Sequence, residues 1–243
     1  MLIHWPGQKR RHLCHELYVD LIHKASVVGV IQDLTIYVWN SKSKSEEYTT
    51  NTKTLGVCEE SLERREIPFI QLGSEFDKKW VNICKLECGL SALKNTKTTY
   101  TMTLDSSDIV VIGDIISCFE RFKKSQHDVI LNADAATWPF AFPHEFEKKV
   151  GKGSQRFLNS GAILGKTSKL IVIYDYLLNQ FDASKYAGID NQVDYCLKTD
   201  DQIRWKEAYQ HFYPKMMVDY YCEYFQTIND INTWMIKTCH DNQ

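Results

Sequence analysis

Apolar positions near the start of the chain follow first a helical period and then a strand period. Leu13, Leu17 and Leu21 recur every fourth residue, which predicts an amphipathic helix over about residues 9–24, behind a short first strand. The apolar run LTIYVWN, residues 34–40, predicts a strand. The chain therefore begins with a strand, a helix and a second strand.

A polar stretch follows the strand at residues 34–40. Residues 41–54, SKSKSEEYTTNTKT, are low in complexity and are expected to form a mobile surface loop that could act as a lid. Residues 58–73 then predict a helix that leads into a strand ended by Gly73.

The next predicted helix has apolar residues on two sides, so we expect it to be well buried. One side carries Val81, Cys84, Cys88 and Ala92, and the other carries Ile83, Leu86 and Leu90.

Strand and helix patterns alternate over the following hundred or so positions. This alternation is typical of an α/β fold in which helices flank a mostly parallel sheet. The segments are YTMTLDSSDIVVIGD, ISCFERFKK, DVILNAD, RFLNSGAILG and KLIVIYDYLLNQF. No internal repeat or linker divides the sequence, and we expect one domain over residues 1–243.

Composition narrows the possible partners and the compartment. The formal net charge is -2, with 29 basic and 31 acidic side chains, so there is no global field to attract nucleic acid or an anionic membrane. No window approaches the roughly 18 apolar residues that span a bilayer, and the N-terminus resembles neither a signal peptide nor an anchor. The 8 cysteines are scattered through a chain large enough to fold without disulfides. We expect free thiols and a cytoplasmic protein.

The best candidate for chemistry is a turn that ends a strand, because ligands of such sheets gather at the carboxyl ends of the strands. In LDSSD, Asp105 and Asp108 stand at the first and fourth positions of a predicted turn, where two carboxylates can share one hard cation. A phosphatase-type aspartyl nucleophile needs a different spacing of the two aspartates. The alternative is an ordinary turn, since Asp and Ser are common turn formers.

The neighbours of this turn form a recognisable series. TLDSSDIVV, NADAATWP, RFLNSGAILG and EYFQTIND follow one another in a set order, within a likeness that runs over about residues 67–240. The series resembles the glycosyltransferase domain of procollagen-lysine hydroxylases and its stand-alone viral and bacterial relatives. The resemblance implies a GT-A-type, Rossmann-like fold.

The resemblance also implies a metal site. Asp105 and Asp108 match the paired metal carboxylates of the family, and His240, in TCHDNQ, is the candidate third ligand. An imidazole beside two carboxylates suits Mn²⁺ better than Mg²⁺, although Mg²⁺ is an alternative.

Several residues match positions that bind the donor in the family. Lys85 is expected to reach the donor phosphates, with an exposed helix lysine as the alternative, and Phe76 or Trp80 is expected to stack on the donor base. Ser107 lies within the metal turn. The segment Asn159, Ser160 and Gly161 matches an Asn-Ser-Gly motif of the family, in which a small residue lets the backbone approach the substrate.

Three residues are candidates for catalysis or acceptor binding. Trp138 resembles the tryptophan that shapes the sugar and acceptor pocket, with a buried core tryptophan as the alternative. Asp190 and Asn191 stand where the family has an acidic run that ends in Asp-Gln, so Asp190 is a candidate base or a stabiliser of charge on the sugar. A helix N-cap is the alternative for Asp190.

Together these matches predict a metal-dependent transferase that moves a hexose from a UDP-sugar to an unidentified glycan, protein or modified nucleic acid. Two other hypotheses stay open. A transferase acting on modified DNA bases would need a basic surface stripe. A catalytically inactive nucleotide-sugar-binding module is favoured by Asn191, which replaces a carboxylate of the family.

Overall fold

The computed structural model describes residues 2–4, 26–41, 56–73 and 80–227. The predicted helix at residues 9–24, nearly all of the polar loop, Phe76 and His240 lie outside these ranges. Among the described residues, no helix is long and apolar enough to cross a membrane.

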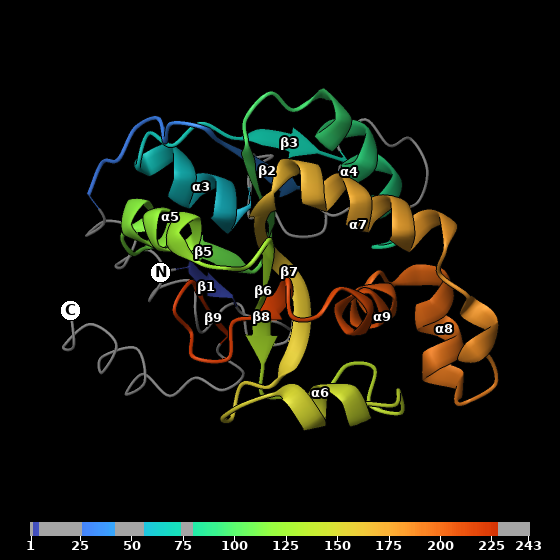
Figure 1. Cartoon of the computed structure of the whole chain (residues 1–243). Helices are drawn as coiled ribbons and strands as arrows, with labels where there is room; N and C mark the ends of the chain where they lie inside the picture. Colours follow the sequence, from blue (N-terminus) through green and yellow to red (C-terminus); the bar gives the residue numbers. More distant parts are fainter. Residues whose placement is uncertain (1, 5–25, 42–55, 74–79, 228–243) are drawn as a thin grey trace.

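Six strands form the central sheet: β2 (Leu34–Trp39), β3 (Ile70–Leu72), β4 (Tyr100–Asp105), β6 (Val129–Asp134), β7 (Phe157–Lys166) and β8 (Met216–Val218). Their order is β3, β2, β4, β7, β6, β8 (Figure 1). Only β7 runs against its neighbours, since it is antiparallel to both β4 and β6 while the other pairs are parallel. The predicted α/β class with a mixed, mostly parallel sheet is confirmed.

A second, smaller sheet contains β1 (Leu2–His4), β5 (Ile109–Val111) and β9 (Phe225–Thr227). The central strand β1 is antiparallel to β5 and parallel to β9. The sheet therefore joins the two ends of the described chain to the strand that follows the aspartate turn.

Helices cover both faces of the central sheet. They are α3 (Val57–Arg64), α4 (Cys84–Asn95), α5 (Ile115–Lys124), α6 (Glu145–Val150), α7 (Thr167–Asn179), α8 (Asn191–Thr199) and α9 (Gln202–Phe212). One core packs α3 and α5 against the sheet, and another packs α4, α7 and α9. Because side chains alternate along β6, Ile130 joins the first core and Leu131 joins the second.

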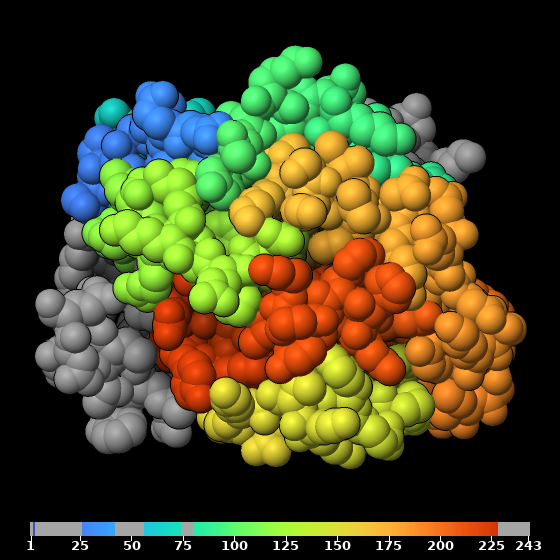
Figure 2. All heavy atoms as spheres, in the orientation of Figure 1, coloured from blue at the N-terminus to red at the C-terminus, as the bar shows by residue number. Residues whose placement is uncertain are grey.

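Most predicted elements are present, but two differ from expectation. On α4 the fully buried face carries Leu86 and Leu93, whereas Cys84 and Cys88 are only half-buried. The reason is that α7 packs along the former face. The helix α9 was not predicted, although Trp205 and Tyr209 on it are almost completely buried. In Figure 2 the segment of α9, β8 and β9 lies between those of α5 and α6.

A bulge in β7 lies beside the carboxyl end of β4. Leu131 pairs with Ile163, but the next residue, Asn132, pairs with Asn159, so residues 160–162 are extra on the β7 side. On its other side, β7 pairs Ala162 with Leu104. The bulge thus brings the predicted Asn-Ser-Gly motif to the carboxyl end of β4.

Candidate functional site

Asp105 is the last residue of β4, and the turn 106–108 follows it directly. Hydrogen bonds to the first turn of α3 hold this turn in place. Ser106 Oγ donates a hydrogen bond to Glu59 Oε2 (2.6 Å), and Cys58 N–H donates to the Ser106 carbonyl (3.0 Å). Glu59 is buried and also accepts from Asn40 Nδ2 at 2.6 Å. These contacts fix the position of the predicted metal turn.

The charges of both turn aspartates raise the pKa of the same buried thiol, that of Cys58. Burial raises the pKa of Cys58, and the negative charges of Glu59, Asp105 and Asp108 raise it further. Both turn carboxylates therefore lie near the N-terminus of α3. The predicted pairing of Asp105 and Asp108 as metal ligands stays a prediction.

Lys85 reaches Asp105 from α4. Its Nζ lies 2.5 Å from Asp105 Oδ1, and the side-chain exposures are 4% for Lys85 and 22% for Asp105. Burial lowers the pKa of the Lys85 ammonium, but the charges of Asp105 and Asp201 and the hydrogen bond to Asp105 outweigh burial and raise it. The alternative of an exposed helix lysine is wrong.

A second acidic pair lies at the junction of α8 and α9. Asp201 is 2% exposed, its Oδ2 accepts from Trp205 Nε1 (3.1 Å), and its Oδ1 has no hydrogen-bond partner among the described residues. Burial raises the pKa of Asp201 to about 7; Lys85 opposes this shift, while Asp200 and Asp105 add to it. The pair is thus within electrostatic range of the end of β4.

Neither Asp200 nor Asp201 was singled out from the sequence, although a usable signal exists. The run Asp200-Asp201-Gln202 is also an acidic run that ends in Asp-Gln. Asp190 lies elsewhere: it is exposed at the N-terminus of α8, where its Oδ1 accepts from Gln192 N–H at 2.7 Å. The N-cap alternative for Asp190 is confirmed. The catalytic role of Asp190 and of Asn191, which is also exposed, stays a prediction.

The Asn-Ser-Gly motif is held rigidly in the β7 bulge. Asn159 Oδ1 accepts from Gly161 N–H (2.8 Å), and Gln202 Oε1 accepts from both the N–H and the Oγ of Ser160 (3.1 Å each). Gln202 Nε2 also donates to the Leu158 carbonyl (3.0 Å). Gln202 therefore ties the acidic run to the motif, and the two features belong to one edge of the sheet.

Trp138 lies in the loop after β6 and is 37% exposed, so the buried-core alternative is wrong. Its Nε1 lies 3.4 Å from Asp200 Oδ2. Trp80, by contrast, is 7% exposed and lies beyond the end of β3. A Cβ on Gly73, whose φ is +95°, would come within 2.8 Å of the Trp80 ring. A glycine is therefore required where this ring packs, and the predicted stacking of Trp80 on a donor base stays a prediction.

The residues at the end of β4 suit a hard divalent cation. Asp105 and Asp108 offer carboxylate oxygens from one turn, and Mg²⁺ and Mn²⁺ are commonly bound by one or two carboxylates together with substrate phosphates and water. No group of three or more His, Cys, Asp or Glu side chains that could hold a metal occurs in the described part of the chain. The predicted third ligand, His240, lies outside that part.

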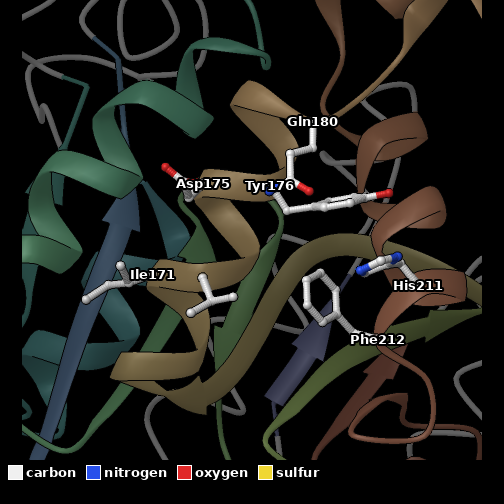
Figure 3. A pocket seen from close by; sticks show the side chains of 7 residues that line it. Ile171, Asp175, Tyr176, Gln180, His211 and Phe212 are labelled. Atoms are coloured by element: carbon white, nitrogen blue, oxygen red, sulfur yellow. The ribbon is translucent and has the colours of Figure 1, made fainter.

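A separate hollow of about 350 Å³ lies between α7 and α9 (Figure 3). Its floor includes Tyr176, whose ring stacks on His211 with centroids 4.6 Å apart. None of the predicted site residues lines this hollow. It is therefore distinct from the end of β4.

Comparison with known proteins identifies the family. The family of the PLOD GT domain matches residues 42–242. A procollagen-lysine,2-oxoglutarate 5-dioxygenase of Drosophila melanogaster is 29% identical over 85 residues, which are 35% of this chain and 12% of the relative. The match thus spans a small part of that protein's length.

The chain also has a low similarity to two solved glycosyltransferases. Mouse xyloside xylosyltransferase 1 has a TM-score of 0.42 and 10% identity, with 98% of this chain and 89% of that chain covered. GlyE of Streptococcus pneumoniae has a TM-score of 0.38 and 14% identity, with 99% and 49% covered.

The family assignment rests on the domain match and not on these two structures. It agrees with the resemblance inferred from the aspartate turn and with the predicted GT-A type of fold. This chain belongs to the family of PLOD glycosyltransferase domains.

Proposed function

We propose that this protein transfers a hexose from a UDP-sugar to an acceptor hydroxyl, with a divalent cation, preferably Mn²⁺, at Asp105 and Asp108. The observation that carries the proposal is the buried ion pair of Lys85 and Asp105 at the end of β4, 2.5 Å apart. A lysine so placed supplies positive charge beside the carboxylates that would face a diphosphate. His240 is the proposed third ligand of the cation.

In the proposed reaction the acceptor oxygen forms a bond to the anomeric carbon, and the bond from that carbon to the diphosphate breaks. A cation bound at the turn would offset the negative charge that builds on the leaving diphosphate. Lys85 adds a second positive charge on the same side. The Asn159–Gly161 bulge presents backbone beside the turn, where the sugar of the donor would lie.

An acidic side chain is needed to take the proton of the acceptor hydroxyl or to stabilise positive charge on the sugar ring. The negative charges of Asp201 and Asp200 are among those that raise the pKa of Lys85, whereas Asp190 is exposed and caps α8. We therefore propose that Asp200 and Asp201 perform the role first sought at Asp190 and Asn191.

The test is release of UDP from a panel of UDP-sugars, with and without Mn²⁺. The variant Asp105→Asn is compared with Asp128→Asn, because Asp128 forms a similar 2.6 Å pair with Lys166 elsewhere on the molecule. Mn²⁺-dependent release from one sugar, lost in Asp105→Asn and kept in Asp128→Asn, supports the proposal. Tight donor binding without turnover would favour an inactive binding module. Absence of both binding and turnover would contradict the proposal.

The proposed compartment is the cytoplasm. Cys58, Cys84, Cys88, Cys118, Cys196 and Cys222 have free thiols in the structure. Fractionation of cells that express the protein tests this proposal, and recovery from a secretory compartment would contradict it.

A further inference from the structure

The loop between β6 and α6 presents two aromatic rings to solvent. Trp138 is 37% exposed and Phe140 is 66% exposed. Their rings meet edge to face, with centroids 5.8 Å apart and an interplanar angle of 82°. The two rings in contact form one small apolar surface, and we call this pair the aromatic ledge.

The aromatic ledge is held in place by the protein around it. Phe140 N–H donates to Gln192 Oε1 on α8 (2.8 Å), and Phe142 N–H donates to the Pro139 carbonyl (3.2 Å). Phe142 is buried, and its ring packs on Tyr186 at 4.9 Å. The loop is thus anchored on both sides of Phe140 while the Phe140 ring stays exposed.

A buried charged network lies beneath the loop. Glu147 Oε1 and Oε2 accept from Lys206 Nζ at 2.7 and 2.8 Å, and Oε1 also accepts from Leu158 N–H at 2.6 Å. His144 Nδ1 lies 2.7 Å from Glu147 Oε2, and its Nε2 lies 3.0 Å from the Pro139 carbonyl. Both ring nitrogens of His144 therefore face oxygen atoms, one of Glu147 and one of the Pro139 carbonyl. The network joins α6, α9 and β7 to the residue between the two ledge rings.

The aromatic ledge begins at the proposed reaction centre and extends away from it. Trp138 Nε1 lies 3.4 Å from Asp200 Oδ2, and Asp200 Oδ1 accepts from the N–H of Gln202 (2.8 Å), the residue that also holds Ser160. Phe140, two residues further along, therefore lies beside the centre without belonging to the set that faces the donor diphosphate.

Charge near the ledge limits what it can bind. In the segment from residue 182 to residue 200, Asp182, Asp190, Asp194 and Asp200 outnumber Lys185 and Lys198. Lys185 is moreover paired with Glu207 at 3.0 Å. The Asp200 carboxylate beside Trp138 disfavours a polyanion such as DNA at this point. The C–H face of an uncharged pyranose, in contrast, packs well on an aromatic ring and needs no counter-charge.

We propose that Phe140 is a specificity-determining contact for the acceptor, and that with Trp138 it holds an uncharged pyranose whose hydroxyl faces Asp200 and Asp201. This inference rests on the proposed glycosyl transfer. His144, Glu147 and Lys206 are positioning residues for the ledge.

The experiment has a binding arm that requires no turnover. Saturation-transfer NMR is recorded with methyl glucosides and methyl galactosides on the wild type, Phe140→Ala, Phe140→Tyr and Tyr213→Ala. Tyr213 is the control because it is 41% exposed and its ring packs on Phe146 and Tyr209 rather than on Trp138 or Phe140. We expect saturation transfer to at least one pyranoside in the wild type, Phe140→Tyr and Tyr213→Ala, and its loss in Phe140→Ala. Absence of transfer in the wild type, or equal transfer in Phe140→Ala, overturns the inference.

A second arm measures glycosyl transfer to the same pyranosides and to duplex DNA that contains hydroxymethylated bases. Phe140→Ala is expected to raise the KM for the pyranoside roughly tenfold, while kcat and UDP release without acceptor change less than about twofold. Transfer to the DNA but to no pyranoside overturns the inference and leaves the transferase proposal intact. Absence of UDP release from any donor contradicts the transferase proposal, and the binding arm then decides the ledge alone.

Discussion

Lys85 Nζ lies 2.5 Å from Asp105 Oδ1 although the two residues are 20 positions apart in sequence and belong to α4 and β4. The ion pair forms because the first turn of α4 and the carboxyl end of β4 meet at the same edge of the sheet. The backbone supports this approach, since Ile83 N–H donates to the Thr199 carbonyl at the end of α8. The three segments that carry Lys85, Asp105 and Asp201 are thereby fixed relative to one another.

The Lys85→Met substitution tests the role of this pair. The substitution removes the positive charge that faces the half-buried Asp105 and the buried Asp201. We therefore expect a loss of roughly 3 kcal/mol in the free energy of unfolding. UDP release is expected to fall by about 100-fold or more. Lys166→Met is the control, since Lys166 is 39% exposed and its pair with Asp128 is worth about 1 kcal/mol or less. Urea denaturation and UDP release measure the two effects, and equal behaviour of the two variants would count against the account.

Asp201 is expected to make stability depend on pH. Its folded-state pKa is raised to about 7 from an ordinary value of 3.8, so the folded protein holds this proton more tightly than the unfolded chain. The contribution of Asp201 to stability is therefore fully present below about pH 4 and is lost as the pH rises through about 7. In the Asp201→Asn variant, the midpoint of urea denaturation is expected to change less with pH between pH 4 and 8 than in the wild type. An unchanged pH profile in this variant would disprove the assignment.

Glu147, in the buried network under the aromatic ledge, is expected to make stability depend on pH in the opposite direction to Asp201. Burial raises the pKa of Glu147, but His144 and Lys206 outweigh burial and lower it below its ordinary value. Stability from Glu147 is thus present above about pH 4.5 and lost as the pH falls through the lowered pKa.

Glu147→Gln leaves Lys206 buried beside a neutral amide, and we expect a loss of about 3 kcal/mol or more at pH 7. The double variant Glu147→Gln with Lys206→Met removes the unpaired charge and is expected to recover part of this loss. Guanidinium denaturation checks both variants. A single variant as stable as the wild type would show that the network carries no net stabilisation.

The sequence predicted β2, α3, β3, α4, β4, α5, β6, β7 and α7 because each has a clear period, and it offered the start of α8 as the alternative role of Asp190. Asp114 likewise accepts from Ser117 N–H and begins α5. The aspartate turn was also predictable, since polar residues that end an apolar strand mark the functional edge of such a sheet. Local pattern was sufficient for these features.

Features that depend on long-range packing were not predictable in the same way. Whether Lys85 points to solvent or to Asp105 depends on where α4 lies against β4. The helix α9 was missed because polar residues such as Lys206 and Glu207 interrupt its apolar pattern, and Lys206 is buried only because Glu147 on α6 neutralises it. The choice between Asp190 and Asp200 as the acidic site likewise depended on tertiary contacts.

The most direct test of the central claim is binding of Mn²⁺ to the turn at Asp105 and Asp108 in the presence of UDP. Electron paramagnetic resonance of free Mn²⁺ follows a titration of the wild type, Asp105→Asn and Asp128→Asn with saturating UDP. We predict one tight Mn²⁺ site in the wild type and in Asp128→Asn, and an affinity at least about tenfold weaker in Asp105→Asn. Equal Mn²⁺ affinity in Asp105→Asn and the wild type would contradict the account.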